Sequence, residues 1–109
     1  MSTQKETIDF ILEKLGDPKK FSARAMFGEY ALYANGRVVA LVCDDLLHVK
    51  ILTASGELEK LCEKGTPYPG AKLHYVVEES QLSTIDELPS ILLAIAKLLP
   101  AKKVKRKTT

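Results

Sequence analysis

The sequence lacks several features that would point directly to a function. Its 109 residues include no tryptophan and only two cysteines, Cys43 and Cys62. Without an export signal, two cysteines favour free thiols in a reducing compartment over a disulfide scaffold. The longest apolar run, residues 91–96, is much shorter than the ~20 residues that a membrane-spanning helix needs. We therefore expect a cytoplasmic protein that does not insert into a membrane.

Motifs for common cofactors and catalytic groups are also missing. The six glycines are scattered and form no GxGxxG or GxxxxGK[ST] phosphate loop. Cys43, Asp44, Asp45 and His48 are potential ligands within six positions, but no CxxC, HxH or HExxH pattern accompanies them. Aspartates at a hairpin tip are typical turn formers. We expect no catalytic residue, no metal and no cofactor, and an enzyme or metal protein using Cys43 and His48 is kept as the weaker alternative.

Charge is unevenly distributed along the chain. The whole sequence has 16 basic and 14 acidic residues, a net charge of +2. Five basic residues lie between positions 102 and 107, so the rest of the chain has 11 basic and 14 acidic residues, a net charge of −3. An acidic body is a poor surface for nucleic acid. Weak contact with DNA or RNA is therefore expected only from the tail, through Lys102, Lys103, Lys105, Arg106 and Lys107. The alternative is that residues 101–109 are simply a disordered, solubilising end.

Turn signals divide the middle of the chain into strands. Asn35-Gly36 lies between two apolar runs and is typical of a type I′ hairpin turn. Asp44-Asp45 indicates a second tight reversal. Upstream, Gly28 interrupts a continuous strand pattern, and a lone glycine there usually marks a bend. We therefore predict one long strand over residues 23–33, kinked at Gly28, and three antiparallel strands in all.

Two helices should enclose this meander. Apolar residues at helical spacing predict a helix from Gln4 to Leu15, with Thr3 and Glu6 as a capping box. A second apolar stripe predicts a helix that begins near Glu87 or Leu88, because Pro89 is tolerated only in the first turn, and that ends before Pro100.

The segment between the meander and the last helix is less regular. A short helix is predicted over residues 56–64, followed by a rigid Pro67–Gly70 loop and a strand over residues 72–77. Pro67–Tyr68 is a further candidate for a brief edge strand. The order α-β-β-β-α-β(β)-α predicts an α+β domain over residues 1–100, with a mainly antiparallel sheet packed by the N- and C-terminal helices.

The central segment resembles a known family. Arg24-x-Met26-Phe27-Gly28-x-Tyr30-x-Leu32-Tyr33-x-Asn35-Gly36, continuing to Leu47-x-Val49-Lys50, is similar to the N-terminal domain of the TfoX/Sxy competence regulators. Gly65-x-Pro67-Tyr68-Pro69-Gly70 and the last helix fit the later part of that pattern. The resemblance covers roughly residues 5–99. It implies this α+β order and a regulatory role, in which the domain helps a transcription activator of the cyclic-AMP receptor type to switch on DNA-uptake genes. Full-length members carry a second, helical domain that this sequence does not show, so we expect a stand-alone module.

The expected function is therefore a non-enzymatic, regulatory protein-interaction domain. Its candidate protein-binding residues are Arg24, Met26, Phe27, Tyr30 and Tyr33. Arginine and tyrosine are enriched at interfaces. The competing interpretation, which the residue types favour, places Arg24 in an internal salt bridge with Glu29 or a helix acid, and Met26 and the aromatic residues in the core or half-buried in the sheet. The alternative function is non-specific nucleic-acid binding through the tail. The sequence leaves a monomer or a homodimer open, with residues 46–50 or 72–77 as candidate edge strands for pairing.

Overall fold

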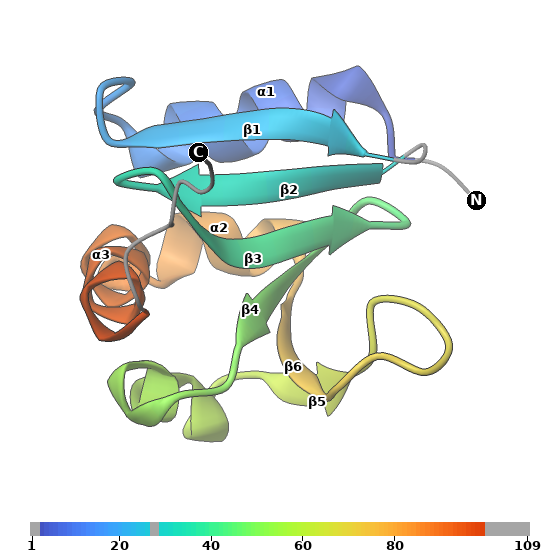
Figure 1. Ribbon diagram of the computed structural model, residues 1–109, viewed down its shortest axis with the longest axis vertical. Coiled ribbons are helices and arrows are strands. Elements are labelled where there is room, and N and C mark those ends of the chain that lie inside the picture. The colour runs from blue at the N-terminus through green and yellow to red at the C-terminus, as the bar shows by residue number, and fades with distance from the viewer. Residues whose placement is uncertain (1–2, 27–28, 100–109) are drawn as a thin grey trace, which may run out of the picture.

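A six-stranded antiparallel sheet with helices packed on one face makes up the fold (Figure 1). The computed structural model describes residues 3–26 and 29–99. The strand order is β1-β2-β3-β4-β6-β5. In chain order the elements are α1 (Lys5–Leu15), β1 (Phe21–Met26), β2 (Glu29–Ala34), β3 (Arg37–Cys43), β4 (Leu46–Lys50), the 3₁₀ helix η1 (Thr53–Lys60), β5 (Glu63–Gly65), β6 (His74–Val77), α2 (Glu79–Thr84) and α3 (Leu88–Leu98). The α+β class and the antiparallel sheet are confirmed.

Both predicted tight turns are present. Asn35 and Gly36 have φ values of 52° and 82° between β2 and β3, as a type I′ turn requires. Asp44 and Asp45 have φ values of 54° and 61° between β3 and β4. Aspartate tolerates this left-handed conformation better than most residues, because its short polar side chain bonds locally. Asp44 and Asp45 are therefore turn formers.

The predicted long strand kinked at Gly28 is wrong. β1 and β2 are separate strands that pair antiparallel, from Phe21 opposite Ala34 to Met26 opposite Glu29. The chain therefore reverses direction between Met26 and Glu29, and four strands, not three, precede η1. The sequence misled because the apolar pattern runs almost unbroken through this point. Residues 27 and 28 themselves lie outside the described part of the chain.

The predicted edge strands are also wrong. β4 lies between β3 and β6, and β6 lies between β4 and β5, so neither is available for pairing with a second copy. The edges of the sheet are β1 and the three-residue β5. β5 consists of residues 63–65, although residues 63 and 64 were predicted to end a helix, and it takes the edge position expected for Pro67–Tyr68.

Helix α1 begins where predicted, but a distant residue caps it. The N-cap residue is Gln4, and Thr3 and Glu6 form no capping box. Instead, Asp45 Oδ1 in the β3–β4 turn accepts hydrogen bonds from the backbone N–H of Gln4 and from Thr7 Oγ1, both at 2.8 Å. Thr3 Oγ1 donates to Glu29 Oε1 and to the carbonyl of Val42. The first turn of α1 is thus capped by groups of the sheet and its turns, and not by side chains of the helix itself.

The last helix matches its prediction, whereas α2 was not predicted. α3 begins at Leu88 with Pro89 in its first turn, because the missing N–H of proline is not needed there. α2 follows β6 directly at Glu79, in a stretch for which no helix was predicted. In the described residues, 3–26 and 29–99, no helix is long and apolar enough to cross a membrane.

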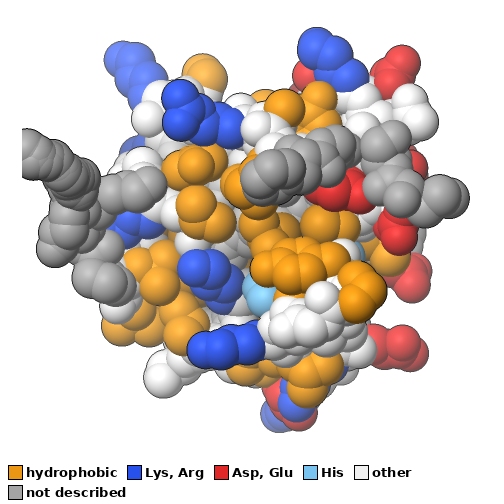
Figure 2. Space-filling model, turned by 45° about the vertical axis from the view of Figure 1, so that its right-hand side comes forward, with side chains coloured by type: hydrophobic (Ala, Val, Ile, Leu, Met, Phe, Trp, Pro, Cys, Tyr) orange, Lys and Arg blue, Asp and Glu red, His pale blue; other side chains and the backbone are white. Residues whose placement is uncertain are grey.

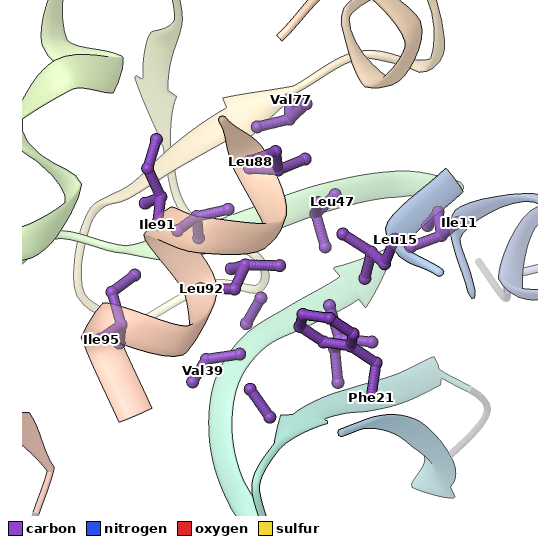
Figure 3. Packing of buried hydrophobic residues seen from close by; sticks show 14 of the residues in the cluster. Ile11, Leu15, Phe21, Val39, Leu47, Val77, Leu88, Ile91, Leu92 and Ile95 are labelled. Atoms are coloured by element: carbon purple, nitrogen blue, oxygen red, sulfur yellow. The ribbon is translucent and has the colours of Figure 1, made fainter. Parts of the chain in front are cut away.

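The core lies between the sheet and the helices (Figure 3). Leu88, Leu92 and Ile95 of α3 point toward the sheet strands and are at most 1% exposed. A β-bulge in β3 adds to this contact. Leu32 pairs with Ala40 but Tyr33 pairs with Val38, so Val39 is the extra residue and is fully buried in the core.

Candidate functional site

The two faces of the sheet can be read from its register. Residues directly opposite one another on paired strands point to the same face. One row packs against the helices and is mostly buried, running through Ala23, Leu32, Ala40, Val49, Tyr75 and Lys64. The adjacent row points away from the helices, running through Arg24, Ala31, Leu41, His48, Val76 and Glu63. We call the face that carries this second row the open face.

A pocket of about 510 Å³ lies on this side of the molecule. Its size is within the range of ~300–1,000 Å³ that small-molecule pockets occupy. Figure 2 shows orange, hydrophobic side chains gathered near the centre of its view. Only Glu29 among its lining residues is charged, the full lining being Met26, Glu29, Tyr30, Leu41, Cys43, Pro67 and Tyr68. We call this the partner pocket.

The loop between β5 and β6 forms one wall of the partner pocket. The Ala71 N–H donates to the Tyr68 carbonyl at 3.1 Å, and Gly70 between them has a φ of +88°. Proline followed by a glycine of positive φ at the two central positions is typical of a type II turn. This turn holds Tyr68 54% exposed beside the buried Pro67. The rigid loop predicted from the sequence therefore presents an aromatic side chain at the pocket.

The structure brings together only some of the predicted protein-binding residues. Met26 and Tyr30 line the partner pocket, and Met26 is 41% exposed. Arg24 is exposed two residues before Met26 on β1 and forms no ion pair among the described residues, so the internal salt bridge is not found there. Tyr33 is half-buried and lies outside the pocket lining. Phe27 falls outside the described residues, as do Lys102, Lys103, Lys105, Arg106 and Lys107.

Sequence reasoning missed the other half of the pocket. Leu41 and Cys43 were not among the predicted protein-binding residues, and Pro67 and Tyr68 were predicted only as part of a rigid loop or a brief edge strand. The sequence does contain a signal, because a tyrosine held between two prolines is exposed more readily than one in a strand. It contains no signal for which strands the loop would face, since that depends on β5 pairing with β6.

Cys43 and His48 lie on the same face but show no sign of catalytic pairing. Burial raises the pKa of the Cys43 thiol, and the nearby carboxylates of Glu29 and Asp44 raise it further. The thiol is therefore protonated at neutral pH, whereas the thiolate is the nucleophile. Burial lowers the pKa of His48, and its Nδ1 donates to the carbonyl of Leu46 at 3.0 Å. No hydrogen bond joins the two side chains within the described part of the chain.

No potential metal site is found in the described residues. They contain no group of three or more His, Cys, Asp or Glu side chains placed to hold an ion. Asp45 directs its carboxylate at the start of α1, where it accepts two hydrogen bonds. The Asp44–Asp45–His48 segment therefore has a structural role at this end of the sheet.

Comparison with known proteins identifies the family. The TfoX N-terminal domain matches residues 12–92. Over 112 aligned residues the chain is also 33% identical to an uncharacterized 12.7 kDa protein encoded in the trpE 5′ region of Spirochaeta aurantia, covering 100% of this chain and 94% of that protein. The matched segment includes every strand of the sheet and all residues that line the partner pocket. The chain therefore belongs to the TfoX N-terminal domain family, which is a family of regulatory domains associated with competence.

Proposed function

We propose that this domain is a non-catalytic regulatory module that binds a protein partner through the partner pocket. The observation that supports this most strongly is the pairing of an apolar pocket with exposed Met26 and Tyr68 at its wall. Methionine and tyrosine are enriched in the buried centres of protein interfaces, and a pocket that receives a partner side chain is typical of a binding hot spot. Arg24 lies beside Met26 on β1 and is available for a carboxylate of the same partner.

The partner that family membership suggests is a transcription activator of the cyclic-AMP receptor type. In this proposal an apolar side chain of the activator enters the pocket between Leu41 and the Pro67–Tyr68 wall. The domain contributes no chemistry of its own, because the raised pKa of Cys43 and the lack of an orienting base leave no activated nucleophile there. Its effect on transcription follows from holding the activator in a particular complex.

The direct test is a binding titration between purified full-length protein and the purified activator of the same organism. Tyr68→Ala should weaken binding at least about tenfold, because truncating a hot-spot aromatic costs about 2 kcal/mol or more. Leu98→Ala is the matched control, since Leu98 is 56% exposed but lines none of the pockets described. If Tyr68→Ala binds as the wild type does, the partner pocket is not the interface. If the wild type does not bind, this class of partner is wrong.

Direct nucleic-acid binding through the tail is the second candidate. Leu99, the last described residue, lines a pocket with Lys50 and Lys72, so two further lysines lie at the end of the described chain. Binding of this kind should weaken steeply between about 50 and 200 mM salt, because it releases counterions from the phosphates. Full-length protein in which all five basic tail residues are replaced by Gln should then lose affinity for duplex DNA. Equal binding by both proteins would contradict it.

A further inference from the structure

A second pocket on the open face gathers positive charge. It has a volume of about 300 Å³ and lies where β4 ends, β6 begins and α3 ends. Lys50, Lys72 and His74 provide its polar groups. Its remaining lining is apolar and consists of Ile51, Leu52, Leu73 and Leu99. Figure 2 shows Lys or Arg side chains beside a histidine at the margin of the hydrophobic surface. We call this the basic pocket.

The fold holds these cations together without a counter-charge. Lys50 stands directly opposite His74 on the paired strands, which places their Cβ atoms about 4.5–5.5 Å apart. Among the residues that the structure describes, no acidic side chain lines the basic pocket. The ion pairs between described residues use other lysines, at positions 5, 20 and 64. Burial and then the charge of Lys72 lower the pKa of Lys50, so the amine is less stable as a cation than a free lysine would be.

The neighbouring apolar residues narrow the class of ligand. Leu73 is 55% exposed and Ile51 36% exposed, although both are large hydrophobic side chains. The His74 Nδ1 donates to the Lys72 carbonyl at 2.8 Å, which fixes the orientation of the ring at the wall of the pocket. Lysine amines bind phosphate or carboxylate oxygens as point charges. A ligand that matched the whole pocket would thus have an anionic head and a short apolar body.

We propose that the basic pocket binds a small organic anion. Its phosphate or carboxylate head contacts the amines of Lys50 and Lys72, and its apolar body lies against Leu73 and Leu99. The ligand supplies the counter-charge that the fold does not. The basic pocket is separate from the partner pocket, with no lining residue in common, so either proposal can fail without the other.

Calorimetric titration of the full-length protein tests this directly. The probes are hexyl phosphate and methyl phosphate, hexanoate and acetate, with hexylammonium as the cationic control. We expect one hexyl anion to bind at least tenfold more tightly than its methyl counterpart, and hexylammonium not to bind. A preference for hexyl phosphate assigns a phosphate head, and a preference for hexanoate assigns a carboxylate. Failure of both hexyl anions to bind at millimolar concentration overturns the proposal.

Variants locate the binding within the molecule. Lys50→Gln and Lys72→Gln should each weaken the preferred anion about tenfold, the loss expected for one charge-assisted hydrogen bond. Lys19→Gln is the matched control, because Lys19 is exposed and lies outside the basic pocket. Leu73→Ser should weaken the hexyl anion but not the methyl one. Replacing all five basic tail residues by Gln should preserve affinity. If that variant loses binding, or if Lys50→Gln and Lys72→Gln bind as Lys19→Gln does, the basic pocket is not the site.

Discussion

The two faces of this sheet differ in kind although they share the same six strands. On the helix-covered face, one row of cross-strand partners is mostly apolar and lies under α1 and α3. One residue along, the open-face row begins with Arg24, ends with Glu63 and buries His48 in its middle. The first face therefore carries most of the core, and the second carries the two pockets for which we propose binding.

The largest expected difference between the two faces is in the loss of stability when a side chain is truncated. Leu92 is fully buried between α3 and the sheet. Leu92→Ala should lower the free energy of unfolding by about 2–5 kcal/mol, from lost burial and the cavity that remains. Leu41→Ala, at a half-buried open-face position, should cost less than half as much. Chemical denaturation measures both, and equal costs would contradict the division of roles.

The cap on α1 is the next largest effect, because it joins the sheet to the helix layer. Asp45→Gly removes the acceptor of two hydrogen bonds and should cost about 1 kcal/mol of stability. Asp44→Gly is a matched control, since Asp44 has a similar positive φ but its carboxylate makes no hydrogen bond to a described residue. In thermal unfolding, Asp45→Gly should therefore have a lower melting temperature than Asp44→Gly. Equal melting temperatures would show that the long-range cap adds nothing.

The buried His48 should make stability depend on pH. Burial lowers its pKa in the folded state below the ordinary value of about 6.5, so the unfolded chain binds the proton more readily. The contribution of neutral His48 is fully present above that value and is lost as pH falls below it. Between about pH 7.5 and pH 5.5, His48→Gln should therefore lose less stability than the wild type. An identical loss in both proteins would assign the pH dependence to other groups.

Truncating the exposed tyrosine at the partner pocket should have the smallest effect on folding. Tyr68 is 54% exposed, so Tyr68→Ala should change the free energy of unfolding by no more than about 0.5 kcal/mol. The main effect of Tyr68→Ala should instead be the weaker binding of the partner that the titration described above measures. A large loss of stability on denaturation would mean that Tyr68 serves the fold, and that the open face is not reserved for recognition.

Local sequence signals predicted the elements whose cause is local. The Asn35-Gly36 turn, the Asp44-Asp45 turn and the start of α3 at Pro89 each follow from the backbone preferences of one or two residues. The missed reversal between β1 and β2 is a local failure, because the apolar pattern runs almost unbroken through it. Two other failures involve a partner distant in sequence. α1 is capped by Asp45, and residues 63–65 form β5 because they pair with β6. The sequence of α1 does not indicate that Asp45 will cap it, and the sequence of residues 63–65 does not indicate that they will pair with β6.

The candidate site divides in the same way. Met26 and Tyr30 were predicted because they belong to a strand rich in interface residues, and they line the partner pocket. Pro67 and Tyr68 come from a loop whose position depends on tertiary pairing. The basic pocket was not predicted at all, because Lys50, Lys72 and His74 meet only when β4 and β6 pair. No pattern within the β4 or β6 segment indicates that these three residues will lie together.

Methyl NMR of the complex with the activator tests the central claim most directly. The Met26 methyl group reports on the open face and a Leu12 methyl group on α1, where Leu12 is half-buried on the helix-covered side. If the open face is the recognition surface, titration with the activator should shift or broaden the Met26 signal and leave Leu12 unchanged. A response at Leu12 with none at Met26 would contradict the account.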